Sequence, residues 1–186
     1  YAITYEGDIL VVRCRVKGHA REITSTALDL QARILRNGTE NRFESEDFRN
    51  DDDLYLAFQS PKAGYLAVYL VDADDQAFCL LPYRGQTEGI YPIEANRRYL
   101  FFNAEAASAA ERAYVDEYTM TCERDVEHNQ IYVIFSPNPF SKATDANEND
   151  GLPRQLSFDD FNHWLVKHRK VDSEMNVVIK PVVVKK

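Results

Sequence analysis

Thiols and imidazoles are the side chains of this sequence that could supply a nucleophile, a general base or a metal ligand. Cys14, Cys79 and Cys122 are far apart and form no CxxC pair. His163 and His168 are five residues apart, which places them on different sides of a helix. Because these are not the usual spacings of zinc ligands, the sequence predicts no metal site.

Catalytic partners meet in space rather than in sequence, so a thiol–imidazole pair such as Cys122 with His128 stays open as a cysteine hydrolase hypothesis. The alternative is that the three cysteines are small core residues, because each falls within a predicted strand. The sequence contains no GxSxG, P-loop, GxGxxG or HExxH motif. These observations favour a non-enzymatic protein with no catalytic, cofactor-binding or metal-binding residue.

Asp72, Asp74 and Asp75 resemble the start of a calcium-binding loop, but two required features are missing. Ala77 stands where such a loop needs its glycine, and Tyr83 stands where it needs its bidentate acid. A hairpin turn therefore explains these aspartates better. The glycosylation sequon at residues 37–39 matters only in a eukaryotic secretory setting.

The aromatic side chains, 11 Tyr, 10 Phe and 1 Trp, could build a platform that binds sugars. Tyr65 and Tyr69 project from one face of one predicted strand, and Tyr55 on a neighbouring strand could lie beside them. These three tyrosines are the candidate ligand-binding residues. The alternative is that they pack under a helix or line the second face of a sheet.

The composition is that of a globular domain, with 45% hydrophobic and 28% charged residues. A formal net charge of −8 argues against nucleic acid, whose binding proteins usually carry a basic face. No apolar run approaches the roughly 20 residues of a membrane helix. The predicted partner is therefore a protein or a glycan, with no nucleic acid and no membrane span.

The pattern of residues 1–50 predicts a strand followed by a helix. Residues 8–16 change from a continuous apolar run to alternation, which is typical of a half-buried strand. Ile23, Ala27, Leu30 and Ile34 then recur at helical spacing, with Gly38 placed to end that helix. The polar residues 41–53 mark either an internal boundary or a long connection inside one domain.

Residues 54–140 predict a series of short antiparallel strands separated by turns. Most of these runs alternate apolar and polar residues, as half-buried strands do. Residues 131–135 are apolar on both faces, which indicates a central strand covered on each side. Short strands at this spacing favour an antiparallel β-sandwich.

Residues 152–186 predict a helix followed by a final strand. Ser157 is placed to cap the helix, with Asp160 three positions further on. The final strand, residues 176–184, contains Pro181, which cannot donate to a ladder of hydrogen bonds. It is therefore predicted to be an edge strand or a bulged one.

Three stretches together resemble a known family. They are residues 54–82, with Gly64-Tyr65-Leu66 ahead of Leu80-Leu81-Pro82, residues 127–137, and residues 152–165. The pattern resembles the bacterial family called domain of unknown function 4384, especially its Bacteroidales forms. The resemblance implies a β-rich accessory domain of an exported protein, often joined to protease-like or kinase-like modules, and it brings no catalytic residues.

These observations predict one compact α+β unit over residues 1–186, mainly β. An antiparallel β-sandwich carries an N-terminal strand–helix element and a C-terminal helix–strand element. The expected function is a non-enzymatic binding or scaffolding module, and the resemblance implies a periplasmic, envelope or secreted location. Carbohydrate binding through the tyrosines and a cryptic cysteine hydrolase are the alternatives.

Overall fold

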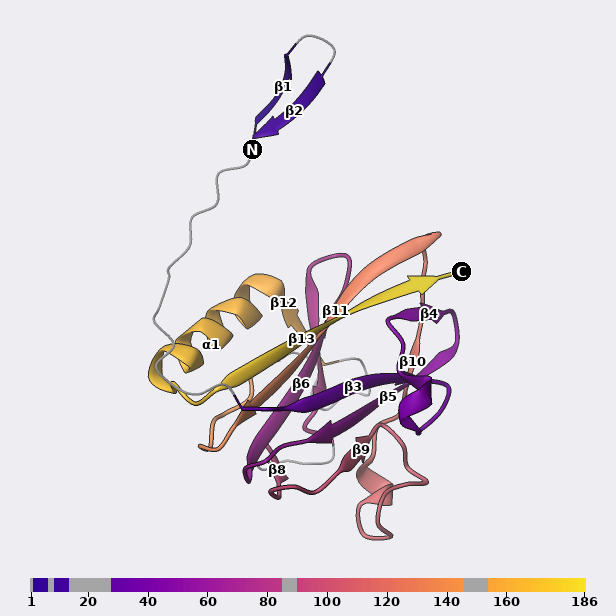
Figure 1. Ribbon diagram of the computed structural model, residues 1–186, viewed down its shortest axis with the longest axis vertical. Coiled ribbons are helices and arrows are strands. Elements are labelled where there is room, and N and C mark those ends of the chain that lie inside the picture. The colour runs from indigo at the N-terminus through magenta and orange to yellow at the C-terminus, as the bar shows by residue number, and fades with distance from the viewer. Residues whose placement is uncertain (1, 7–8, 14–27, 85–89, 146–153) are drawn as a thin grey trace.

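The computed structural model describes residues 2–6, 9–13, 28–84, 90–145 and 154–186 of the chain (Figure 1). The protein is mainly β, as predicted, with two larger sheets and one α-helix among these residues. A separate hairpin pairs β1 (Ala2–Glu6) with β2 (Ile9–Arg13), and in the described part of the chain it joins neither larger sheet. The end of the strand predicted at 8–16, Cys14 included, lies outside the described residues.

The smaller sheet is built around one long strand. Its strands are β3 (Gln31–Arg36), β5 (Asp52–Gln59), β9 (Tyr99–Phe101) and β10 (Tyr118–Met120). β5 pairs with β3 along one side and with β9 and β10, end to end, along the other. All of these pairings are antiparallel.

The larger sheet has its longest strands in the middle. Its main order is β12 (Gln155–Ser157), β7 (Gln76–Leu81), β6 (Gly64–Val71), β11 (Val126–Ser136), β13 (Asn176–Lys185) and β4 (Asp47–Arg49). β8 (Tyr91–Ile93) continues the β7 side of β6. The pairing of β4 with β13 is parallel, and the other pairings of this sheet are antiparallel.

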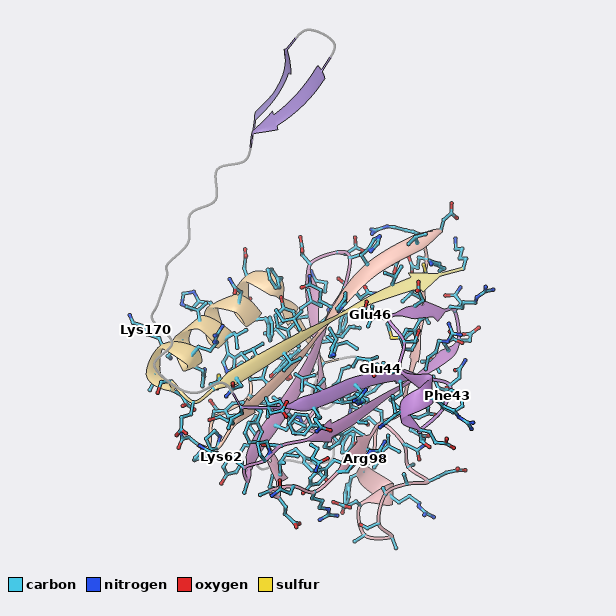
Figure 2. All side chains as sticks on the ribbon, viewed as in Figure 1. Phe43, Glu44, Glu46, Lys62, Arg98 and Lys170 are labelled. Atoms are coloured by element: carbon cyan, nitrogen blue, oxygen red, sulfur yellow. The ribbon has the colours of Figure 1, made fainter. Side chains whose placement is uncertain are left out.

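The elements form three layers: the smaller sheet, the larger sheet, and α1 (Phe158–Val171) on the outer face of the larger sheet (Figure 1). The core between the sheets contains Leu66 and Val68 of β6, whereas their neighbours Ala67 and Tyr69 lie in the cluster under α1. This is the alternation of a strand with both faces covered. Charged side chains such as Lys62, Arg98 and Lys170 lie at the surface (Figure 2).

β11 confirms the prediction of a central strand covered on each side. It lies between β6 and β13. Ile131, Val133 and Phe135 belong to the core between the sheets, while Tyr132 and Ile134 belong to the cluster under α1.

Helix α1 begins where the capping pattern predicts. Ser157 is its N-cap, and its Oγ accepts a hydrogen bond from the backbone N–H of Asp160 at 3.1 Å. Phe161 and Leu165 are the fully buried residues of the helix and face the larger sheet. β13 follows the helix, so the predicted C-terminal helix–strand element is confirmed.

The helix predicted from Ile23 is wrong where the structure describes it, because β3 is a strand. Ile23 and Ala27 lie outside the described residues. Leu30 and Ile34 are four residues apart, a spacing that places residues on one face of a helix and equally on one face of a strand. Ala32 between them also packs in the core, which settles the period as two.

Gly38 therefore does not end a helix. Asn37, just before it, has a positive φ of 54°, and the chain turns there into the short 3₁₀ helix η1 (Asn41–Phe43). A Cβ on Gly38 would lie 2.4 Å from the ring of Phe43, which is labelled in Figure 2. Residues 41–53 then cross from the smaller sheet to β4 of the larger sheet and return to β5.

Pro181 lies where β13 has a neighbour on one side only. β13 pairs with β11 along its length, while β4 covers only Val183–Lys185. Val183 donates its N–H to Glu46 on the β4 side, at 2.7 Å. The nitrogen of Pro181, two residues earlier, faces the same open side, so its missing N–H removes no bond to β11.

Candidate binding pocket

The three predicted tyrosines do not form one platform. Tyr65 and Tyr69 share a face of β6, as predicted, but that face is covered by α1, and Tyr69 is 0% exposed. Its ring lies 4.8 Å from that of Phe161, and its hydroxyl accepts the Ala143 N–H at 3.0 Å. Tyr55 belongs to β5 of the other sheet. The alternative of packing under a helix therefore holds for Tyr69.

The two described cysteines are buried, and neither forms a hydrogen bond with a described imidazole. The Cys122 thiol lies 2.8 Å from the carbonyl oxygen of Arg124 and 3.4 Å from that of Val184. His128 is exposed on β11. The structure therefore does not bring the proposed Cys122–His128 pair together.

The aspartates at residues 72–75 form a turn, as predicted. Oδ1 of Asp72 accepts the N–H groups of Asp74 at 2.8 Å and Gln76 at 2.9 Å. Asp75 adopts a positive φ of 57°. These contacts join β6 to β7 as a hairpin.

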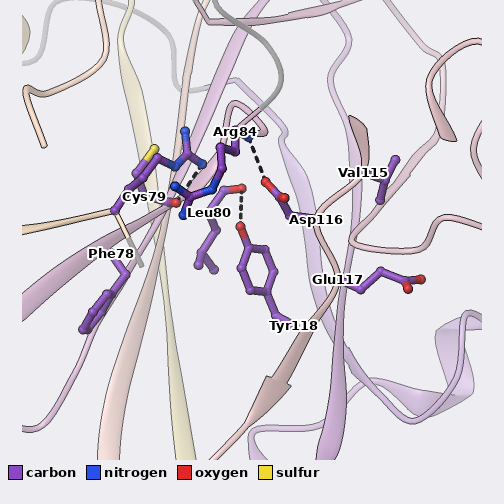
Figure 3. A pocket seen from close by; sticks show the side chains of 9 residues that line it. Phe78, Cys79, Leu80, Arg84, Val115, Asp116, Glu117 and Tyr118 are labelled. Atoms are coloured by element: carbon purple, nitrogen blue, oxygen red, sulfur yellow. Dashed lines mark hydrogen bonds between the residues drawn. The ribbon is translucent and has the colours of Figure 1, made fainter. Parts of the chain in front are cut away.

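A pocket of about 320 Å³ opens beside the outer edge of β7 (Figure 3). Its walls come from three segments that are distant in the sequence: the end of β7 with the residues after it, the residues entering β10, and Arg154 before β12. The lining residues are Phe78, Cys79, Leu80, Arg84, Val115, Asp116, Glu117, Tyr118 and Arg154. We call this space the Arg154 pocket.

A β-bulge in β7 creates the inner wall of the Arg154 pocket. Val68 pairs with Leu81 and Tyr69 pairs with Cys79, so Leu80 is an extra residue in β7. At the bulge, side chains rather than another strand satisfy the backbone. The Tyr118 hydroxyl donates to the Leu80 carbonyl oxygen at 3.1 Å (Figure 3).

Arg154 is the charged group at the base of this wall and is only 4% exposed. Its Nη2 donates to the carbonyl oxygens of Cys79 at 2.9 Å and Pro82 at 2.6 Å. No carboxylate of the described residues forms an ion pair with this guanidinium. Among the described residues, Asp145 and Asp116 act on this charge only from beyond ion-pair distance, and a buried charge without a directly paired counter-ion is costly.

The acidic residues near Arg154 have other partners. Asp145, whose side chain is fully buried, pairs with Lys142 at 3.0 Å. Asp116 accepts the backbone N–H of Arg84 at 2.8 Å and points towards that residue (Figure 3). Glu117 accepts the N–H of Ala104 at 2.9 Å, and in Figure 3 it points away from Arg84.

The Cys79 thiol lines the pocket but is not poised for nucleophilic chemistry. Burial raises its pKa to about 11, and the opposing effect of the Arg154 charge is smaller. At neutral pH the group is therefore a thiol and not a thiolate. Burial also raises the pKa of Tyr118, with Asp116 adding to the shift. The polar atoms of the pocket are suited to binding rather than to covalent catalysis.

Sequence reasoning missed the Arg154 pocket. Its residues come from positions 78–84, 115–118 and 154, and no motif joins them. Arg154 entered the sequence argument only as part of the stretch that carries the family resemblance. A single arginine after a polar segment carries no signal of burial, because the carbonyl oxygens that hold it lie 75 and 72 residues away in the sequence.

No helix in the described part of the chain is long and apolar enough to cross a membrane. The chain matches no protein-family model, no curated protein and no solved structure. The resemblance to domain of unknown function 4384 therefore stays a prediction from the sequence.

Proposed function

We propose that the protein is a binding module whose Arg154 pocket receives a carboxylate group of a protein partner. The observation that carries this proposal is a buried guanidinium that forms no ion pair with any carboxylate of the described residues and lies in the wall of a pocket. The location in the bacterial envelope, which the family resemblance implies, stays part of the proposal.

The donors of Arg154 support an anionic ligand. A guanidinium has five N–H donors, and those of Nη2 bind two carbonyl oxygens. The Tyr118 hydroxyl also interacts with the guanidinium, so at least two of the N–H groups of Nε and Nη1 are left for a further acceptor. They are the donors that a ligand would meet.

Charge and size favour a carboxylate. An anion would supply a directly hydrogen-bonded counter-charge, which the described carboxylates do not, through hydrogen bonds that each contribute roughly 1.5–3 kcal/mol. A volume of about 320 Å³ suits a small group such as an acidic side chain. Because one or two such bonds give modest affinity, we expect a Kd of roughly 1–10 mM for free acetate.

The test is a titration of the ¹⁵N-labelled protein with sodium acetate, with sodium chloride keeping the ionic strength constant. We expect a saturable shift of the Arg154 Nε–Hε resonance and of the amides of residues 79–82. Arg154→Gln should abolish saturation. Arg98→Gln is the matched control, because Arg98 also donates to a backbone carbonyl, that of Thr39 at 3.2 Å, but lies outside the pocket.

Arg154→Gln removes donors from two carbonyls and could disturb the fold, so a second variant is needed. Asp116→Asn removes a negative charge from the pocket and should tighten acetate binding by about threefold. Equal acetate shifts in wild type and Arg154→Gln, or no saturable shift in wild type, would overturn the proposal. Sodium glucuronate binding tenfold tighter than acetate would replace the protein partner with an acidic glycan.

A further inference from the structure

A second cavity lies between residues 138–141 and the C-terminal half of α1, and is distinct from the Arg154 pocket. It has a volume of about 500 Å³ and is lined by Asn138, Pro139, Phe140, Ser141, His168, Val171 and Asp172. We call it the α1 groove. It brings a serine hydroxyl and an imidazole to one surface, although they are 27 residues apart in the chain.

The imidazole of His168 is held in one orientation. Its Nδ1 lies 3.0 Å from the carbonyl oxygen of Trp164, one turn earlier in α1. Because a carbonyl oxygen only accepts, Nδ1 carries the hydrogen and Nε2 presents a lone pair. The ring is also packed, with its centroid 5.0 Å from that of Trp164 and 6.4 Å from that of Phe140.

The lone pair on Nε2 faces a hydroxyl. Nε2 lies 3.4 Å from Oγ of Ser141, whose side chain is in the exposed part of the groove. The backbone of Ser141 is fixed to the helix, because its carbonyl oxygen accepts the indole N–H of Trp164 at 3.0 Å. Two residues later, the Ala143 N–H is bound to the Tyr69 hydroxyl.

Asp172 lines the same groove but is fully engaged elsewhere. Its Oδ2 accepts from the Ser136 hydroxyl at 2.5 Å, and its Oδ1 accepts from Asn138 Nδ2 at 3.1 Å and from the Glu174 N–H at 2.9 Å. Asp172 therefore fixes the wall of the groove. The group that orients His168 is the Trp164 carbonyl.

We propose that Ser141 is a nucleophile, that His168 is its general base, and that the α1 groove accepts small acyl esters. The arrangement has the three parts of an activated nucleophile: the attacking group, the base within reach, and a third group that orients the base. Distances of this kind often shorten only when substrate is bound. It differs from the hydrolase hypothesis drawn from the sequence, in which a cysteine was the nucleophile.

In the proposed reaction the Ser141 Oγ attacks the ester carbonyl carbon and its proton passes to Nε2 of His168. The ester C–O bond then breaks, and Nε2 returns the proton to the leaving alcohol. Water, deprotonated by the same nitrogen, releases the acid and restores the serine hydroxyl. The exposed Val171 and the ring of Phe140 give the groove an apolar rim that suits a short acyl chain.

The test uses two probes on the full chain: hydrolysis of 4-nitrophenyl acetate, and labelling by an alkyl fluorophosphonate. In labelling, an Oγ–P bond forms, the P–F bond breaks and the proton passes to His168, so intact mass shows one adduct. We expect one adduct on wild type and none on Ser141→Ala. We expect His168→Gln to slow labelling and ester hydrolysis by about 100-fold.

Two matched controls test whether labelling is specific to Ser141 and His168. Ser108→Ala removes another exposed serine, one that hydrogen-bonds Glu111 rather than an imidazole. His163→Gln removes the other, exposed, histidine of α1. Both should label like wild type.

Loss of the Ser141 hydroxyl leaves the indole–carbonyl bond of residue 141 in place, so Ser141→Ala is expected to fold. A wild-type protein that gains no adduct, while a known serine hydrolase is labelled in parallel, would overturn the proposal. So would labelling of Ser141→Ala at the wild-type rate.

Discussion

The two faces of the larger sheet bury similar numbers of side chains from the same strands but differ in chemistry. Towards the smaller sheet, the residues of β6 and β11 that form the core have hydrocarbon side chains, among them Leu66, Val133 and Phe135. Towards α1, the same strands and β7 present Tyr69, Tyr132 and the Cys79 thiol. At these strands, one face packs hydrocarbon groups, and the other contains hydroxyl and thiol groups that need partners.

This difference in chemistry indicates which face of the larger sheet can contribute to a functional site. The hydrocarbon face has no group that a ligand could recognise, and its contribution is stability. The helix-covered face borders both candidate sites, since Cys79 lines the Arg154 pocket and Trp164 positions His168 in the α1 groove. The cost of burying polar atoms is offset there by fixed hydrogen bonds, which also hold functional groups in place.

The largest loss of stability is expected when a large side chain is removed from the hydrocarbon face. Phe135→Ala empties a fully buried site whose ring lies 5.9 Å from that of Phe58 across the sandwich. Because both sheets contribute to this site, it cannot collapse easily, and the free energy of unfolding should fall by about 4 kcal/mol. Urea unfolding followed by circular dichroism measures the change.

Val126→Ala is the control for Phe135→Ala, because it shortens an exposed side chain on the same strand. It should change the free energy of unfolding by less than about 0.5 kcal/mol. If Phe135→Ala lowered the free energy of unfolding by less than about 2 kcal/mol, the two sheets would be able to move together and close the cavity.

The sandwich was predictable because alternation is a local signal. In residues 54–59 and 65–70, Leu, Val and Phe alternate with Tyr, Ala and Gln, and β5 and β6 appear where that pattern lies. The same signal failed at β3, where Leu30 and Ile34 satisfied both periods. Alternation also cannot distinguish a face in water from a face under a helix, so Tyr69 was open to both interpretations.

The sites were far less predictable than the fold. Arg154 binds the carbonyl oxygens of Cys79 and Pro82, which are 75 and 72 residues away in the sequence, and Ser141 meets His168 across 27 residues. Neither arrangement has a fixed spacing in sequence. The one local feature that could have drawn attention is the packing of His168 with Trp164, four residues apart on a helix.

A smaller effect is expected when a ring is removed from the helix-covered face. Phe161 is fully buried, and its ring contacts those of Tyr69 and Tyr132 at 4.8 and 5.1 Å. Phe161→Ala should lower the free energy of unfolding by about 3 kcal/mol, because a single helix can shift into part of the space. Hydrogen exchange should show the loss in α1 while β11 stays protected.

Val166→Ala on the exposed side of α1 is the matched control for Phe161→Ala. If Phe161→Ala removed protection equally from β11 and α1, the helix and the sandwich would form one cooperative unit. The contrast between the two faces would then concern chemistry alone and not stability.

The smallest expected effect is on how the free energy of unfolding changes with pH, to which the Cys79 thiol on the helix-covered face contributes. Burial raises the pKa of Cys79 to about 11 from an ordinary value near 9, so the unfolded chain releases this proton first as pH rises. Stability from this group is therefore full below about pH 9 and is lost between pH 9 and 11, a change on the order of 2 kcal/mol. Cys79→Ala should remove that part of the alkaline loss, as measured by urea unfolding at pH 8, 9, 10 and 11.

Cys122→Ala is the comparison for Cys79→Ala, since Cys122 is buried in the core between the sheets and its removal leaves the Cys79 thiol in place. The part of the alkaline loss that comes from Cys79 should remain in this variant. Tyr69 stays in both variants, and burial raises its pKa well above the ordinary value, so some alkaline loss persists in each. If Cys79→Ala and Cys122→Ala lost stability in parallel with rising pH, the Cys79 thiol would be as well solvated as in the unfolded chain. The Arg154 pocket would then be open to water along the wall that the bulge forms.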